Sequence, residues 1–99
     1  MNRCIAEKWI ADLRDNPPQA KGTLFDGRGY CCLGRLCVVA GRPDSEIKGY
    51  SLPTEKIIAL VGMKSRDGRY PGGFLVADND DGKSFAEIAD IIAANIDEL

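Results

Sequence analysis

Residues 84–97, Ser-Phe-Ala-Glu-Ile-Ala-Asp-Ile-Ile-Ala-Ala-Asn-Ile-Asp, decide the fold class. Ser84 and Glu87 have the types and spacing of a capping box, in which each side chain satisfies a free backbone amide at a helix start. Apolar side chains then recur at helical spacing, at Phe85, Ile88, Ile91, Ile92 and Ile96. We therefore expect a capped helix that runs to about residue 97 and buries one face.

Three more helices are expected upstream. Residues 2–15 carry Ile5, Trp9 and Leu13 at intervals of four, and Pro17 and Pro18 follow directly. This pattern predicts a helix whose Trp9 anchors the core.

The second helix is predicted over residues 30–40 and the third over residues 54–61. The first of these segments has a buried-helix pattern, at Cys32, Leu33, Leu36, Cys37 and Ala40. The β-branched pair at residues 38–39 leaves a strand open as an alternative. Thr54 is a suitable N-cap for the third helix, and Gly62 a suitable terminator.

Short strands are expected at residues 23–25, 49–52 and 74–76. Asp-Gly-Arg-Gly at 26–29 is a turn sequence that could close a hairpin. Residues 63–73 are rich in Lys, Arg, Gly, Asp and Pro, which predicts a long loop of a kind that is often functional or mobile. The sequence therefore predicts a small, mostly helical α+β domain over residues 1–99, with a few short antiparallel strands.

The composition narrows the class of protein. The chain has 99 residues, of which 44% are hydrophobic and 28% charged, as in ordinary globular domains. No apolar stretch approaches membrane-spanning length, and the start of the sequence does not resemble a signal peptide. Four cysteines form no C-x-x-C pair and the chain has no histidine, so we expect buried thiols and neither a metal nor a cofactor. These features predict a cytoplasmic protein that does not contact a membrane.

Charge is distributed unevenly. The net charge is −2, which argues against binding to a nucleic-acid polymer through phosphate neutralisation. Residues 1–75 carry twelve Lys or Arg against eight acids, whereas residues 76–99 carry one Lys against seven acids. The acidic end could pack on the basic part of another copy, or it could be a solvated helix face.

Two groups of residues are candidates for a ligand site. The run at residues 78–82 precedes a helix N-terminus, where Asn79 and Asp80 offer donors and acceptors and Phe85 could stack on a base. The alternative is that this run only caps the helix. Among the arginines, Arg28 and Arg69 lie in glycine-bounded turns, which suits phosphate binding by a planar guanidinium.

Two segments of the sequence, together with residues 9–24, resemble motifs of a known family. They are Tyr-Cys-Cys-Leu-Gly-Arg-Leu-Cys at 30–37 and Asn-Asp-Asp-Gly-Lys-Ser-Phe-Ala-Glu-Ile-Ala-Asp at 79–90. The chain resembles small phage-encoded proteins with these motifs, which are similar to the first type of Thoeris anti-defence protein. It departs from them at Asp78, where they carry leucine, and at the double proline of residues 17–18.

The resemblance implies a sponge: a homo-oligomer that sequesters cyclic ADP-ribose signals without degrading them, and in some members holds cyclic oligonucleotides. Under this hypothesis Asn79, Asp80 and an aromatic such as Phe85 or Phe25 contact base and ribose, while Arg28 and a second arginine hold the phosphates. The alternative hypothesis is a protein-binding inhibitor of a host defence complex, with the acidic helix of residues 84–99 as its interaction face. A hydrolase is the weakest reading, because the chain lacks the commonest general base.

Overall fold

The computed structural model describes residues 1–99. It contains five α-helices, one short 3-10 helix and one antiparallel pair of strands. The mostly helical α+β prediction is confirmed. The elements in chain order are α1 (Arg3–Arg14), α2 (Cys32–Val39), the 3-10 helix η1 (Asp44–Glu46), α3 (Glu55–Val61), β1 (Arg69–Tyr70), β2 (Gly73–Phe74), α4 (Leu75–Asp80) and α5 (Phe85–Ala94).

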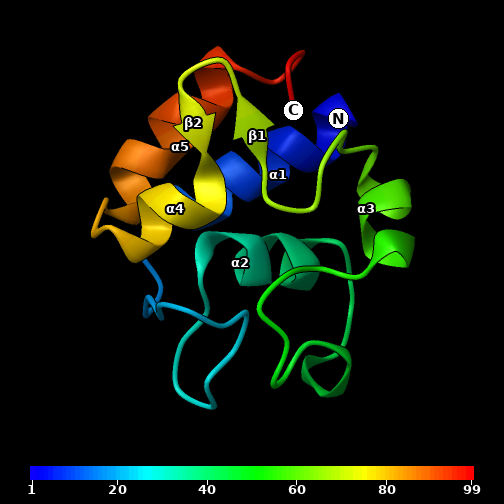
Figure 1. Ribbon diagram of the computed structural model, residues 1–99, viewed down its shortest axis with the longest axis vertical. Helices are drawn as coiled ribbons and strands as arrows, with labels where there is room; N and C mark the ends of the chain where they lie inside the picture. The colour runs from blue at the N-terminus through cyan, green and yellow to red at the C-terminus, as the bar shows by residue number, and fades with distance from the viewer.

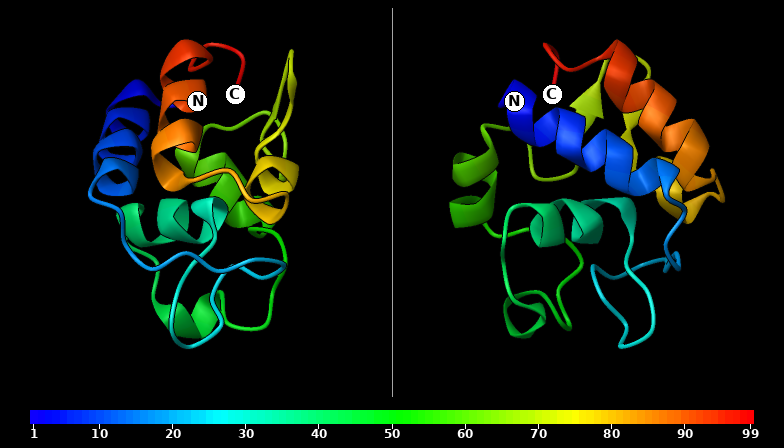
Figure 2. Two further views of the ribbon diagram at one scale, coloured as in Figure 1. Left: turned by 90° about the vertical axis from the view of Figure 1, so that its left-hand side faces the viewer. Right: turned by 180° about the vertical axis from the view of Figure 1, so that it is seen from behind.

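Helix α2 lies at the centre of the molecule. Figure 1 shows it crossing between α1, α4, α5 and the β1–β2 hairpin on one side and the loops before and after α2 on the other, and Figure 2 shows the same division from two other directions. Its inward side chains at residues 32, 33, 36 and 37 are fully buried, as the sequence predicts. The indole Nε1 of Trp9 donates to the carbonyl of Cys32 at 2.8 Å, so α1 is fixed to the first turn of α2.

Gly34 allows the preceding loop to pass close to α2. A Cβ at this position would lie 1.9 Å from the carbonyl oxygen of Leu24, a distance that no side chain can accept. Cys31 caps the same helix, because its Sγ accepts from the Gly34 amide at 3.4 Å. The central Cys-Cys-Leu-Gly segment therefore owes its residue types to packing and capping.

Helices α1 and α5 form the most extensive helix–helix contact. The capping box predicted at the start of α5 is present: Ser84 Oγ accepts from the Glu87 amide, and Glu87 accepts from the Ser84 amide. The helix ends at Ala94 and not at residue 97, because Asn95 leaves helical geometry and its side chain binds the carbonyl of Ile91. None of the helices has the length and apolar character needed to cross a bilayer.

The strand predictions were largely wrong. Residues 23–25 and 49–52 are joined by a single main-chain hydrogen bond, from the Leu24 amide to the Tyr50 carbonyl, and form no ladder. Residues 74–76 were predicted as a strand, yet Leu75 begins α4 and only Phe74 pairs in β2. The predicted loop of residues 63–73 contains the hairpin, whose register is Arg69 with Phe74 and Tyr70 with Gly73.

Candidate functional site

Asn79, predicted to contact a ligand, is instead a buried structural residue. It is 0% exposed and lies in α4, not in a loop. Its Oδ1 accepts from Gln19 Nε2 at 2.9 Å and from the Cys32 amide at 3.1 Å, and its Nδ2 donates to the Ala20 carbonyl at 2.8 Å. The second N–H of Nδ2 donates to Asp80 Oδ1 at 3.4 Å. These bonds join three parts of the chain and leave the amide group no free capacity to read a base.

Asp80 and Phe85 are also engaged within the chain. Asp80 is exposed, but its Oδ1 accepts from the Gly22 amide at 2.9 Å and so holds the loop between α1 and α2. Phe85 is 0% exposed in the core and presents no face to a ligand. The polar run before α5 therefore serves the fold, because its side chains bind the chain's own backbone.

Phe25 belongs to an aromatic stack at the opposite end of the molecule from the hairpin. Its ring stacks on Tyr30 with centroids 4.5 Å apart. The guanidinium of Arg35 lies over the Tyr30 ring at 4.9 Å and binds both carboxylate oxygens of Asp12, at 2.7 and 2.6 Å. Phe25 is half-buried, so part of its surface stays accessible.

Arg28 and Arg69 differ from the other five arginines, whose side chains have partners within the chain. Four arginines pair with carboxylates: Arg3 with Asp97, Arg14 with Asp90, Arg35 with Asp12 and Arg42 with Glu46. A fifth, Arg66, donates to the Pro53 carbonyl.

Arg28 and Arg69 make no ion pair and are exposed, but they lie far apart. Arg28 is in the cyan loop at one end of the molecule, and Arg69 is in the hairpin at the other (Figures 1 and 2). The two arginines therefore do not belong to one site within a single chain.

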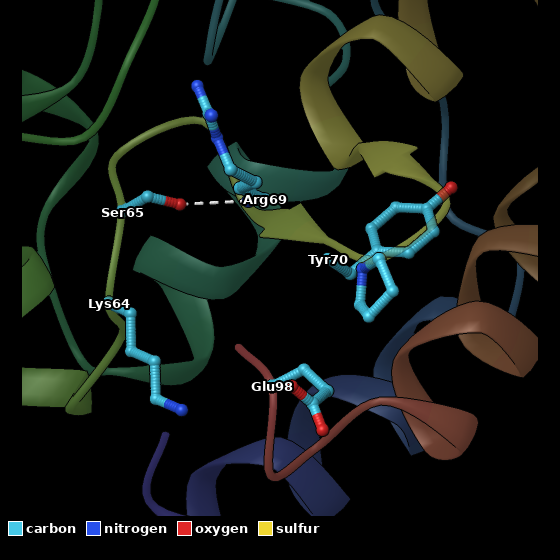
Figure 3. Close-up of a pocket in the computed structure, with 6 residues that line it drawn as sticks. Lys64, Ser65, Arg69, Tyr70 and Glu98 are labelled. Carbon is cyan, nitrogen blue, oxygen red and sulfur yellow. Dashed lines mark hydrogen bonds between the residues drawn. The ribbon is translucent and has the colours of Figure 1, made fainter.

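An open hollow of about 370 Å³ lies beside the hairpin. Its lining residues come from the loop after α3, from β1 and its turn, and from the C-terminal segment: Lys64, Ser65, Arg69, Tyr70, Pro71 and Glu98. Figure 3 shows Lys64 and Ser65 on one side and the Tyr70 ring on the other, with the Arg69 side chain directed away from Lys64 and Glu98. Arg69 is the only residue of the predicted ligand set that lines this hollow.

Local hydrogen bonds hold the basic side of the hollow. Ser65 Oγ accepts from the Arg69 amide at 2.8 Å, which closes the turn between them. The Arg69 guanidinium lies over the Phe74 ring at 4.7 Å, a cation–π contact that leaves its N–H groups without a carboxylate partner. Lys64 Nζ donates to the Asp97 carbonyl at 2.8 Å, a neutral acceptor that leaves the ammonium charge uncompensated.

The aromatic side of the hollow is fixed from α4. The hydroxyl of Tyr70 donates to the carboxylate of Asp78, which also pairs with Lys83 at 3.6 Å. Burial, and then the bond to Asp78, raise the pKa of Tyr70 to about 12, so the phenol stays neutral at physiological pH. Asp78 thus orients the ring.

A second hollow, also of about 370 Å³, lies against α3. Its lining is more apolar and includes Arg42, Lys56, Ile57, Ala59 and Leu60. The side chain of Arg42 binds Glu46 there, so its charge is already compensated. This hollow is therefore less suited to binding an anion than the hollow beside the hairpin.

The acidic C-terminal part pairs within the same chain. Asp90 of α5 binds Arg14 of α1 at 2.9 Å, and Asp97, in the segment after α5, binds Arg3 of α1 at 3.3 Å. Packing of the acidic end on a basic surface therefore already occurs inside one molecule.

The prediction of buried thiols is confirmed for three of the four cysteines and wrong for Cys4. Cys31, Cys32 and Cys37 are buried and free, whereas Cys4 is exposed and free. Burial raises the pKa of the Cys37 thiol to about 12. No three His, Cys, Asp or Glu side chains gather in a way that could hold a metal ion.

The sequence approach missed Lys64, Ser65, Tyr70 and Glu98. For the first three, the signal in the sequence is the long Gly- and Pro-containing loop of residues 63–73, in which only Arg69 is predicted as a ligand residue. No signal in the sequence points to Glu98. The chain matches no protein-family model, no curated protein and no solved structure.

Proposed function

We propose that this protein binds a small phosphate-bearing nucleotide in the hollow beside the hairpin and holds it without turnover. The observation that carries the proposal is the position of Arg69, an arginine without a carboxylate partner that lines the same hollow as Lys64, Ser65 and Tyr70. The resemblance to Thoeris anti-defence proteins suggests the class of ligand, cyclic ADP-ribose and its relatives.

The chemistry of the hollow suits such a ligand. A guanidinium binds two phosphate oxygens at once, an ammonium adds charge, and a serine hydroxyl adds a donor. The rings of Tyr70 and Pro71 provide an apolar wall against which a base or ribose can pack. The volume of about 370 Å³ is at the small end of the range for ligand pockets, and the hollow is open, so we propose that a second copy covers the exposed part of the ligand.

The test is depletion followed by recovery. Purified protein is incubated with cyclic ADP-ribose isomers and with cyclic di- and trinucleotides, and free ligand is measured by chromatography before and after the complex is heated. The proposal predicts that one ligand is depleted and then returns intact. Consumption of the ligand would indicate that the protein is an enzyme. If no ligand of the panel is depleted, the proposal is refuted.

Two arginine variants locate the site. Arg69→Ala should weaken binding about 10-fold or more, because hydrogen bonds between charged groups are each worth about 1.5–3 kcal/mol. Arg28→Ala is the matched control, since it removes an equally exposed and unpaired arginine at the far end of the molecule and should leave binding unchanged. Equal losses in both variants would place the site elsewhere or between copies.

The second candidate is a protein-directed inhibitor that binds through α5 and the acidic segment that follows it. The observation in its favour is that the side chains of Asp90 and Asp97 stay 73% and 87% exposed despite their arginine partners. Asp90→Lys with Asp97→Lys should then abolish binding to a host protein and spare nucleotide binding. Glu98 is left intact in this variant, because it lines the hollow.

A further inference from the structure

The hollow beside the hairpin has a side that the phosphate-binding argument does not use. Lys64 and Arg69 supply positive charge, yet the same lining includes the carboxylate of Glu98. In Figure 3 this side chain rises from the C-terminal segment, away from Ser65 and Arg69. The carboxylate makes no ion pair, so its acceptor capacity is free.

Main-chain contacts on both sides of Glu98 hold it in place. The preceding residue, Asp97, accepts from Lys64 Nζ through its carbonyl at 2.8 Å. The following residue, Leu99, is 1% exposed, and its main-chain oxygen accepts from the Lys64 amide at 2.6 Å. The Glu98 amide itself donates to the Asn95 carbonyl at 2.9 Å. Glu98 is therefore part of the formed wall and not of a loose tail.

A free carboxylate in a hollow that two cations also line has two chemical effects on a ligand. It repels a bare polyanion, because like charges at close range weaken binding. It also accepts two hydrogen bonds, one at each oxygen, which matches the neighbouring hydroxyls of a ribose. Acidic side chains bind ribose hydroxyls in this way in dinucleotide-binding sites.

We propose that Glu98 is a specificity-determining residue, which accepts hydrogen bonds from the ribose hydroxyls of a nucleotide whose phosphates lie on Lys64 and Arg69. This inference rests on the proposed function. It adds that the hollow selects nucleotides that combine ribose and phosphate over inorganic phosphates of the same charge.

The test compares two probes on one variant. The affinities of cyclic ADP-ribose and of inorganic pyrophosphate are measured by calorimetry for the unaltered protein and for Glu98→Gln. The glutamine keeps the length of the side chain but removes the charge and one acceptor. Glu55→Gln is the matched control, since it makes the same chemical change at an exposed residue on α3 that does not line the hollow.

The expected result is a change of opposite sign for the two probes. Glu98→Gln should weaken cyclic ADP-ribose about 10-fold, the effect of losing a hydrogen bond to a charged acceptor. The same variant should bind pyrophosphate more tightly than before, because a repelling charge is removed, whereas Glu55→Gln should change neither affinity. A structural role for Glu98 would weaken both probes, and a purely repulsive role would strengthen both; either result overturns the inference.

Failure of the inference and failure of the proposed function give different results. If the protein binds cyclic ADP-ribose and Arg69→Ala weakens it while Glu98→Gln does not, the proposed function stands and the role of Glu98 is refuted. If the unaltered protein binds pyrophosphate as tightly as the nucleotide, the selectivity is refuted. If it binds neither probe, the proposed function itself fails for this class of ligand, and the inference falls with it.

Discussion

Replacement of Asn79 by alanine should destabilise the protein strongly, since its side chain binds two backbone groups in the interior. The substitution leaves the Cys32 amide and the Ala20 carbonyl without partners, and both of these bonds are buried. Each buried unsatisfied polar group costs about 1–3 kcal/mol, so we expect a loss of about 2–6 kcal/mol in the free energy of unfolding. A domain of this size has a total stability of about 5–15 kcal/mol, so the variant should be close to unfolding.

The assay is urea denaturation followed by fluorescence. Trp9 is the only tryptophan and is 0% exposed, so its emission reports the loss of the core. Asn95→Ala is the control: its side chain makes one hydrogen bond, to the Ile91 carbonyl, at a partly buried position, so a loss of about 1 kcal/mol is expected. A loss below about 1 kcal/mol for Asn79→Ala would refute the structural assignment and restore the ligand-binding role that the sequence suggested.

Three further perturbations test other parts of the structure. Gly34→Ala should prevent native packing, because its Cβ would lie 1.9 Å from the Leu24 carbonyl oxygen; native-like circular dichroism and an unchanged melting temperature would contradict this. Because the pKa of Tyr70 is raised to about 12 from 10.0, its neutral phenol adds stability below pH 10 that is lost as the pH rises through about 12. Ultraviolet titration should therefore show a high phenol pKa that Asp78→Asn lowers, and an unchanged titration in that variant would contradict the bond. A thiol reagent should label Cys4 rapidly in the native protein and label the buried thiols only after denaturation, as mass spectrometry would show for Cys31, Cys32 and Cys37.

The sequence predicted those elements whose signals are local. Caps and terminators lie within a few residues of the helix that they bound, so Thr54, Gly62 and the box at Ser84 were found correctly. The start of α4 was missed, because Leu75 begins a helix for tertiary reasons: its amide binds the Gly68 carbonyl and its side chain is fully buried. No periodicity in a six-residue helix records such contacts.

The candidate site could be predicted only in part, for a related reason. A polar side chain in a motif has the same donors whether they bind a ligand or the chain itself, and Asn79 uses all of them internally. Glu98 lines the same hollow as Lys64 and Arg69 only because of the fold. The three residues are too far apart in sequence to belong to one motif. The position of Arg69 between glycines was the one local signal that led to the hollow.

The contact between α1 and α5 constrains how the chain can fold as it is synthesised. Residues 15–84 separate the two helices, so the buried face of α1 must wait for the last helix before it finds its main partner. Long-range contacts of this kind slow folding, since a large loop must close before they form. On the ribosome, α1 would emerge first with Trp9 and Leu13 uncovered, and the core would close only after α5 has left the exit tunnel.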